Sequence, residues 1–153
     1  MTGKNVSLEY ANSIMYDLQK AFWDERGKGA RFRMTNVGRG YFRDKAISQA
    51  KGGSVAEIVD GIGKMLKEEG VVASISLEQD DRLLRLTIQA CLHHDIEQRF
   101  VANGVEPFTC VPANLVVMAL EEALDRPVEL AEIKVENGSC ELLLVLFDRR
   151  PNS

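Results

Sequence analysis

The sequence contains no apolar run long enough to cross a bilayer. A transmembrane helix needs about 20 consecutive apolar residues, and no stretch of the 153-residue chain approaches that length. The opening segment, MTGKNVSLEYAN, also lacks the apolar centre of a secretory signal peptide. We therefore expect a cytoplasmic protein without a membrane span.

Clustered positive charge is also missing. The net charge is −4 at pH 7, and the densest basic group is interleaved with apolar residues: Arg31, Arg33, Arg39 and Arg43. Proteins bind nucleic-acid phosphates through clustered Lys and Arg side chains. DNA or RNA is therefore not an expected partner.

Cysteine is scarce, and its count is odd. The chain has Cys91, Cys110 and Cys140, and three cysteines in a reducing compartment argue against a disulfide framework. Buried thiols, a metal site and a reactive thiol are the interpretations left open.

Catalytic signatures are absent as well. The sequence has no P-loop, no serine elbow and no dinucleotide fingerprint in the required strand–turn–helix context. Its acidic groups are more typical of solvated faces than of acid/base pairs. A binding domain is therefore favoured over an enzyme, and no residue is assigned a catalytic role.

Hydrophobic periodicity predicts helices in the first part of the chain. A helix over 5–25 carries a broad apolar face with Trp23 near its end, which fits either a core helix or a helix shared with a second subunit. We expect Thr35 or Asn36 to cap a second helix that runs to about Ala50.

The second predicted helix has glycines in its first turns, at Gly38 and Gly40. Each costs on the order of 1 kcal/mol of helix stability, so they indicate either close approach of a backbone or ligand, or a loosely wound helix start. Ser54 and Glu57 form an S-x-x-E capping box for a third helix that Gly70 ends.

Alternating apolar residues predict two strands after this helix, over 71–77 and 84–90, joined by a polar turn at 78–81. The second strand should turn Leu84, Leu86, Ile88 and Ala90 toward the core. This pattern indicates an antiparallel hairpin with one face on the core. A polar, partly helical connection follows over 91–103.

The stretch 104–147 carries the strongest local signals. Cys110 lies in a loop between two prolines, before an apolar helix over 113–124 that should be buried nearly all round. A strand over 128–135 changes phase near Ala131–Glu132, which indicates a β-bulge. Asn137–Gly138 is a strong hairpin-turn signal.

The last strand, 140–147, is apolar on both faces, as expected of a central strand or of one under a subunit contact. The element order is therefore ααα-ββ-α-ββ. It predicts an α+β domain in which an antiparallel sheet of about four strands packs against helices. We expect one ligand-binding domain over 1–153, with a core at 36–147 and a helix at 5–26 that forms a homodimer contact.

This order, and the C-terminal unit in particular, resembles the 4-vinyl-reductase domain family of small-molecule (hydrocarbon) binding domains. The shared features are a cysteine before a buried helix, a strand, a short turn and a final cysteine entering an apolar strand. The resemblance implies a zinc site in which Cys110 and Cys140 match the first and last family cysteines. The middle cysteine is absent, and the strand offers Glu129, Glu132 and Glu136 instead.

The residues themselves also suggest a metal site. Zinc takes four N, S or O ligands, and the C-x-H spacing places Cys91 and His93 on one side of an extended strand end. The candidate zinc ligands are Cys91, His93, Cys110, Glu132 and Cys140. The alternatives are three small buried thiols with two exposed histidines, or a reactive Cys110 with His93 or His94 as base.

A ligand pocket is the second hypothesis. Apolar clefts with a few polar groups hold small molecules, and aromatic residues gather in the helices and at element ends. The candidate ligand-binding residues are Trp23, Arg39, Tyr41, Phe42, Arg43, Phe100, Phe108 and Asn114. For any one of them, plain core packing is the alternative.

The sequence therefore predicts a sensor-like domain that binds a small hydrophobic or aromatic molecule, or a tetrapyrrole-related one, with a structural zinc. The resemblance offers two other readings. One is an enzyme or accessory factor in reduction of a tetrapyrrole vinyl group. The other is a dimerising scaffold without a ligand.

Overall fold

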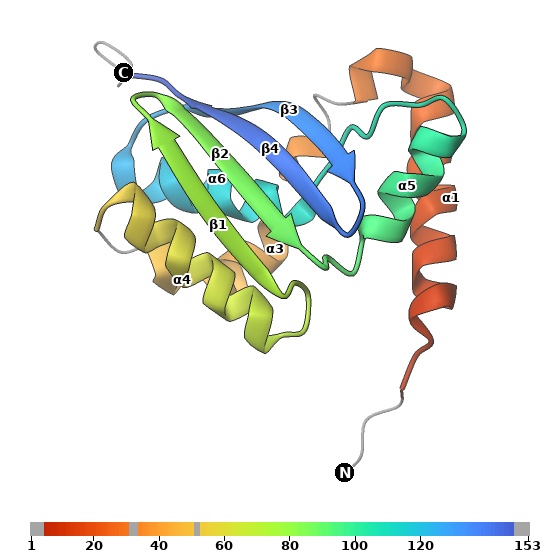
Figure 1. Cartoon of the computed structure of the whole chain (residues 1–153), viewed down its shortest axis with the longest axis horizontal. Coiled ribbons are helices and arrows are strands. Elements are labelled where there is room, and N and C mark those ends of the chain that lie inside the picture. The colour runs from red at the N-terminus through yellow and green to blue at the C-terminus, as the bar shows by residue number, and fades with distance from the viewer. Residues whose placement is uncertain (1–4, 31–33, 51–52, 149–153) are drawn as a thin grey trace.

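The computed structural model describes residues 5–30, 34–50 and 53–148. It is an α+β fold with an antiparallel sheet packed against helices, as predicted (Figure 1). The helices are α1 (Leu8–Arg26), α3 (Arg39–Tyr41), α4 (Val55–Glu68), α5 (His94–Ala102) and α6 (Val111–Leu124). The strands are β1 (Ser74–Asp80), β2 (Leu83–Gln89), β3 (Val128–Glu136) and β4 (Ser139–Leu146).

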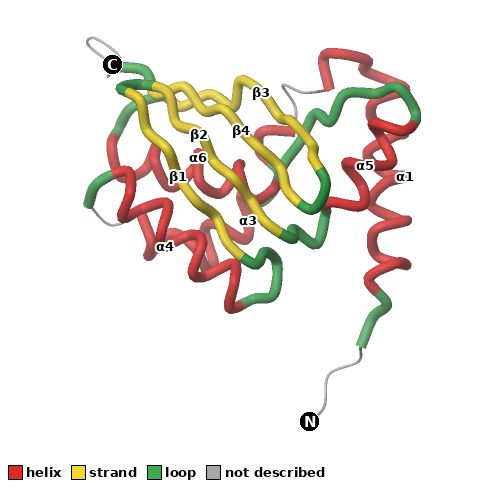
Figure 2. Tube along the Cα trace, viewed as in Figure 1, coloured by secondary structure: helices red, strands yellow, loops and turns green. Residues whose placement is uncertain are grey.

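The sheet has the strand order β1-β2-β4-β3, and every neighbouring pair is antiparallel. Helices α3, α4 and α6 lie behind one face, and no helix of the described residues covers the other face (Figure 2). Strand β4 pairs with β2 on one edge and with β3 on the other, so it is a central strand. That position accounts for its continuous apolar sequence.

The helix-facing side of the sheet forms the main core. Leu84 and Leu86 of β2 lie beside Leu142 and Leu144 of β4, and all four are buried. Alternate residues such as Glu141 point to the open face and are exposed. The period of two in the sequence therefore sorts each strand into a buried and a solvated side.

Helix α4 begins as the capping box predicts. The Ser54 hydroxyl oxygen accepts a hydrogen bond from the Glu57 backbone N–H at 3.2 Å, which satisfies one of the free donors of the first turn. Gly63 lets this helix approach β1 closely, because a Cβ at Gly63 would lie 3.4 Å from the Cβ of Ile75.

Helix α6 is buried on almost every side, as its apolar sequence predicts. Cys110 is the N-cap residue, and Pro112 lies in the first turn, where a missing backbone N–H costs nothing. The β3 register shifts between Leu130 and Glu132, so the predicted bulge is confirmed. The predicted turn at Asn137–Gly138 is confirmed as well, with Gly138 at φ 74°.

The second helix differs from its prediction. Neither Thr35 nor Asn36 caps it, because these residues lie in a separate 3-10 turn over Met34–Asn36. The helical stretch starts after Gly38, whose φ of 100° favours glycine. It then passes through a π-helical turn over Phe42–Ala46 and a 3-10 turn over Ile47–Ala50.

The first hairpin is shifted relative to the prediction. Strand β1 runs on to Asp80, so the turn is the two-residue Asp81–Arg82 loop rather than 78–81. Asp81 takes a positive φ of 55° there, as tight hairpin turns require. Ala90 was predicted to face the core, but it lies beyond the strand, exposed, with φ 51°.

Helices α1 and α5 stand side by side at one end of the sheet (Figure 1). They share a second apolar cluster, separate from the main core, whose buried members are Ala30, Ile96, Phe100 and Phe108. The outer side of α1 and the residues just before it leave large apolar side chains exposed, namely Val6, Leu8, Tyr10, Ile14 and Leu18. In the described part of the chain, no helix is both long and apolar enough to cross a membrane.

Candidate functional site

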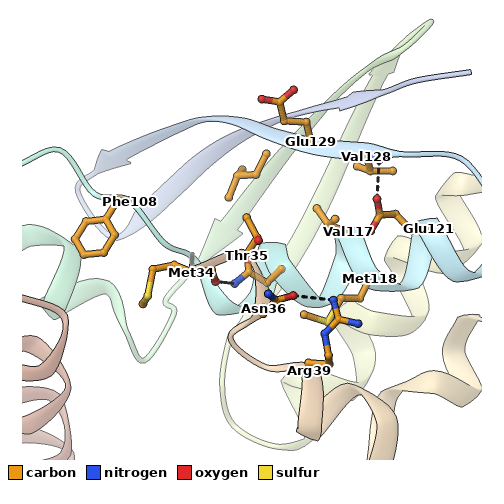
Figure 3. Close-up of a pocket in the computed structure, with 12 residues that line it drawn as sticks. Met34, Thr35, Asn36, Arg39, Phe108, Val117, Met118, Glu121, Val128 and Glu129 are labelled. Atoms are coloured by element: carbon orange, nitrogen blue, oxygen red, sulfur yellow. Dashed lines mark hydrogen bonds between the residues drawn. The ribbon is translucent and has the colours of Figure 1, made fainter. Parts of the chain in front are cut away.

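A cavity of about 210 Å³ lies between α6, β3 and the segment 34–39 (Figure 3). The apolar part of its lining comes from Met34, Phe108, Val117, Met118, Val128 and Leu130. The polar part comes from Thr35, Asn36, Arg39, Asn114, Glu121 and Glu129. An apolar wall with a few polar groups is the usual composition of a small-molecule site.

A buried amide holds one wall of this cavity in place. The Asn114 side-chain N–H₂ donates to the backbone carbonyls of Met34, at 3.0 Å, and Val37, at 3.2 Å. Asn114 is only 3% exposed, and a buried amide is costly unless it is bonded. These two bonds therefore fix the irregular segment 34–37 against α6.

The polar groups of the cavity have different roles. The Glu121 carboxylate accepts a hydrogen bond from the Val128 backbone N–H at 3.1 Å, which ties α6 to the start of β3. The Arg39 guanidinium donates to the Asn36 side-chain oxygen at 2.7 Å. The carboxylate of Glu129 points away from the cavity (Figure 3). Arg39 is thus the cationic group among the residues that line the cavity.

Three of the eight predicted ligand-binding residues line the cavity: Arg39, Phe108 and Asn114. Two more contact it indirectly, because Trp23 stacks on Phe108 and Phe100 meets Phe108 edge to face.

The other three predicted ligand-binding residues lie elsewhere. Phe42 is buried in the main core, Tyr41 packs against that core, and Arg43 is exposed. Burial raises the pKa of the Tyr41 hydroxyl, and the charge of Glu69 adds to this effect.

A second candidate centre lies where α5 meets β4. One ligand atom from each of His94, Glu97 and Cys140 lies within 4.8 Å of the other two. The Cys140 thiol donates to the Glu97 carboxylate at 2.7 Å, and its Sγ is 3.5 Å from the Nδ1 of His94. His94 and Glu97 are three residues apart on α5, so they share one face of that helix.

This cluster is electrostatically unusual. Glu97 is 4% exposed, and no ion pair of the described residues includes it. Burial raises the pKa of its carboxyl to about 7, although the hydrogen bond from Cys140 opposes this shift. Burial also raises the pKa of the Cys140 thiol, and the charge of Glu97 adds to it. A buried carboxylate without a cation is unfavourable, so the cluster would gain from a bound metal ion.

The other two cysteines border the same cluster. Burial raises the pKa of Cys91 to about 11, with a further contribution from the charge of Glu97. Burial raises the pKa of Cys110 as well, and the charges of Glu97, Cys91 and Cys140 add to it. Both thiols therefore lie close enough to Glu97 to respond to its charge.

The structure separates the predicted metal ligands into two groups. Of the three cysteines, Cys140 belongs to the cluster with His94 and Glu97, whereas Cys91 and Cys110 are buried in the main core outside that group. Glu132 lies on the open face of the sheet, where its carboxylate is 3.5 Å from the Lys134 ammonium. His93 lines a small cavity of about 10 Å³ beside α1, with its Nδ1 buried and unbonded among the described residues.

Glu97 and the pairing of His94 with it were missed. The His94-x-x-Glu97 spacing could have predicted this pair. It places the two side chains on one helix face only if 94–102 is helical. The segment 91–103 was predicted only as a polar, partly helical connection, because its hydrophobic periodicity is weak.

Comparisons with known proteins identify the fold. No family model matches the sequence, and no curated protein does. One solved structure, the phenol-responsive sensory domain of the transcription activator PoxR with phenol, resembles the chain with a TM-score of 0.61. The match covers 88% of this chain and 74% of that chain at 16% sequence identity. At this identity the likeness establishes a common fold.

Proposed function

We propose that the chain forms one small-molecule-binding, sensor-like domain that takes a hydrophobic or aromatic molecule between α6, β3 and segment 34–39. The observation that carries this proposal is the cavity of about 210 Å³ there, with its apolar wall and its few polar groups. The similarity in fold to a phenol-responsive sensory domain supports it, as does the resemblance to the 4-vinyl-reductase family, to which we assign the chain.

The dimensions of the cavity define the ligand class. An apolar cavity of about 150 Å³ can hold a benzene molecule, so 210 Å³ suits a single ring with substituents. Phe108, Met34 and Met118 would contact the ring, since thioethers pack well against aromatic edges. A hydroxyl or similar acceptor on the ring would accept a hydrogen bond from the Arg39 guanidinium, which lines the cavity.

A cavity-filling variant tests this proposal. Val117 lines the cavity, so Val117→Phe should occupy the ligand space. Val101→Phe is the matched control, because Val101 is 54% exposed on α5, outside the cavity. Phenol and toluene should raise the melting temperature of the parent and of Val101→Phe, by an amount that grows with concentration. They should leave Val117→Phe unchanged, and equal stabilisation of both variants would contradict the assignment of the site.

We propose in addition that His94, Glu97 and Cys140 bind a structural zinc ion. Their nitrogen, oxygen and sulfur donors are those that zinc accepts, and the separations are compatible with one ion. A fourth ligand is expected in a closed tetrahedral site. Cys110 and Cys91 are the candidates, because both are buried in the same core cluster as Cys140.

The adjacent histidines provide a matched test of this cluster. His94→Gln removes a cluster ligand, whereas His93→Gln removes the neighbouring imidazole that lines the cavity beside α1. Native mass spectrometry of the parent and of His93→Gln should give one zinc ion per chain. His94→Gln should give none. If His93→Gln loses zinc and His94→Gln retains it, the zinc ligand is His93 and the proposed assignment of His94 is wrong.

Dimerisation is the last element of the proposal. The exposed side chains of Tyr10, Ile14 and Leu18 recur every four residues on one side of α1, as in helices that pair. We propose that this side forms a homodimer contact. Light scattering should give a dimer for the parent and a monomer for Ile14→Glu, whereas a monomeric parent would refute the contact.

A further inference from the structure

The single tryptophan of the chain is stacked on a wall of the ligand cavity. Trp23 belongs to α1 and does not line the cavity. Its ring centroid lies 5.3 Å from that of Phe108, with an interplanar angle of 30°. Phe108 does line the cavity. One aromatic ring therefore separates α1 from a bound molecule.

Phe108 is enclosed on the sides that face away from the cavity. Phe100 of α5 meets it at 5.3 Å and 63°, an edge-to-face contact favoured by the ring quadrupoles. Met34, a second cavity residue, packs in the same cluster as Trp23 and Phe108. A ligand that displaces Phe108 would therefore act on its ring contacts with Phe100 and Trp23.

Helix α1 is attached by several other contacts. The Tyr16 ring lies 4.8 Å from that of Phe100, and the Tyr16 hydroxyl accepts a hydrogen bond from the Asn103 side chain at 3.2 Å. Asn12 donates to the Leu92 carbonyl at 3.0 Å, and the Arg99 guanidinium contacts the Ser13 hydroxyl and the Tyr16 ring. Asn12 is the buried residue of this 19-residue helix. A helix with few buried side chains belongs to the less stable part of a structure, and Trp23 is the α1 residue that stacks on the cavity-lining Phe108.

We propose that Trp23 is a positioning residue for the cavity wall, and that ligand occupancy and the docking of α1 are thereby coupled. This inference rests on the proposed ligand site. Coupling between two sites is reciprocal: a molecule that holds Phe108 in place strengthens the docking of α1, and a docked α1 strengthens ligand binding. The exposed side of α1 is the surface through which occupancy would be reported.

The expected effect follows from the strength of an aromatic pair. Loss of such a contact changes an equilibrium by roughly two- to tenfold. Trp23→Leu should therefore weaken phenol binding by about that factor, whereas Trp23→Phe, which keeps an aromatic ring, should restore most of it. Glu9→Ala, an exposed substitution on the same helix outside the proposed dimer contact, should leave phenol affinity unchanged.

Trp23 also supplies the direct readout, because its fluorescence reports on this one position. Titration of the full chain with phenol should change Trp23 emission and slow amide hydrogen exchange in α1. Both changes should have the same midpoint phenol concentration as the thermal-shift titration. The Val117→Phe variant should show no further emission change on addition of phenol.

The failures of the two proposals are distinguishable. If phenol raises the melting temperature while Trp23 emission, α1 exchange and the affinity of Trp23→Leu stay unchanged, the coupling is overturned and the ligand site stands. If neither phenol nor toluene stabilises the chain, the ligand site is contradicted. The Val117→Phe variant then decides the coupling. Its filled cavity should slow amide hydrogen exchange in α1 relative to the parent, and unaltered exchange would overturn the coupling.

Discussion

Zinc should stabilise this domain through His94, Glu97 and Cys140, and two substitutions separate the metal effect from the fold. His94→Gln and Glu97→Gln each remove one of the three donors that lie within 4.8 Å of one another. Both replacements are close in size to the original side chain. Glu97 touches the main core through the hydrogen bond that it accepts from Cys140, and an amide at this position can still accept that bond.

The magnitude follows from binding linkage. Free zinc at about a hundred times its dissociation constant stabilises the folded state by about 2.7 kcal/mol. A domain of roughly 150 residues gains about 2–4 °C in melting temperature per kcal/mol. Zinc should therefore raise the melting temperature of the parent by roughly 5–11 °C, and should not raise that of either variant.

Without metal, the Glu97→Gln substitution should not lower the stability of the domain. Glu97 is a buried carboxyl whose pKa is raised to about 7, mainly by burial. An amide at this position can still accept the hydrogen bond from Cys140 and carries no charge to desolvate. Metal-free Glu97→Gln should therefore be at least as stable as the metal-free parent near neutral pH.

The assay is thermal unfolding followed by circular dichroism, with chelator and then with increasing zinc. His93→Gln is the control and should keep the full zinc response. A zinc-dependent rise in Glu97→Gln equal to that of the parent would refute the assignment of the cluster. So would a metal-free Glu97→Gln that is several degrees less stable than the metal-free parent.

Two further predictions follow from the buried polar groups. Because the pKa of Glu97 rises from 4.5 to about 7 on folding, its stabilising contribution is complete below pH 4.5 and is lost as pH rises through 7. The free energy of unfolding of the metal-free parent relative to that of Glu97→Gln should thus decrease between pH 5 and pH 8, by on the order of 3 kcal/mol at most. Urea unfolding at each pH measures this difference. A difference that stays constant with pH would contradict the raised pKa of Glu97. Asn114→Ala should cost about 1–3 kcal/mol, because it removes the two side-chain bonds that hold the carbonyls of Met34 and Val37 against α6. It should also weaken phenol binding, and full phenol affinity would mean that segment 34–37 needs no anchor.

The sequence predicts the sheet and its neighbouring helices well, because local patterns determine them. The period-2 alternation around Leu84 and Leu86, the Ser54 cap and the Asn137–Gly138 turn each act within a few residues. The errors fall where backbone geometry overrides pattern. Gly38 and Ala90 both take positive φ, and neither position is marked by side-chain periodicity.

The site was less predictable, because tertiary packing assembles it. Arg39, Phe108 and Asn114 were selected by residue type, and they do share one cavity. The pairing of Glu97 with Cys140 joins residues 43 positions apart, and it depends on how α5 docks against β4. Glu132 was selected from its place in the chain, but the β3 pleat turns it to the open face.

Methyl NMR of the methionines tests the ligand site most directly. Met34 and Met118 line the cavity, whereas Met65 packs against the main core from α4. An aromatic ring in the cavity shifts nearby methyl resonances through its ring current. On addition of phenol or toluene, the signals of Met34 and Met118 should move and saturate while that of Met65 stays in place. Unmoved signals from Met34 and Met118 at saturating ligand would contradict the proposed function.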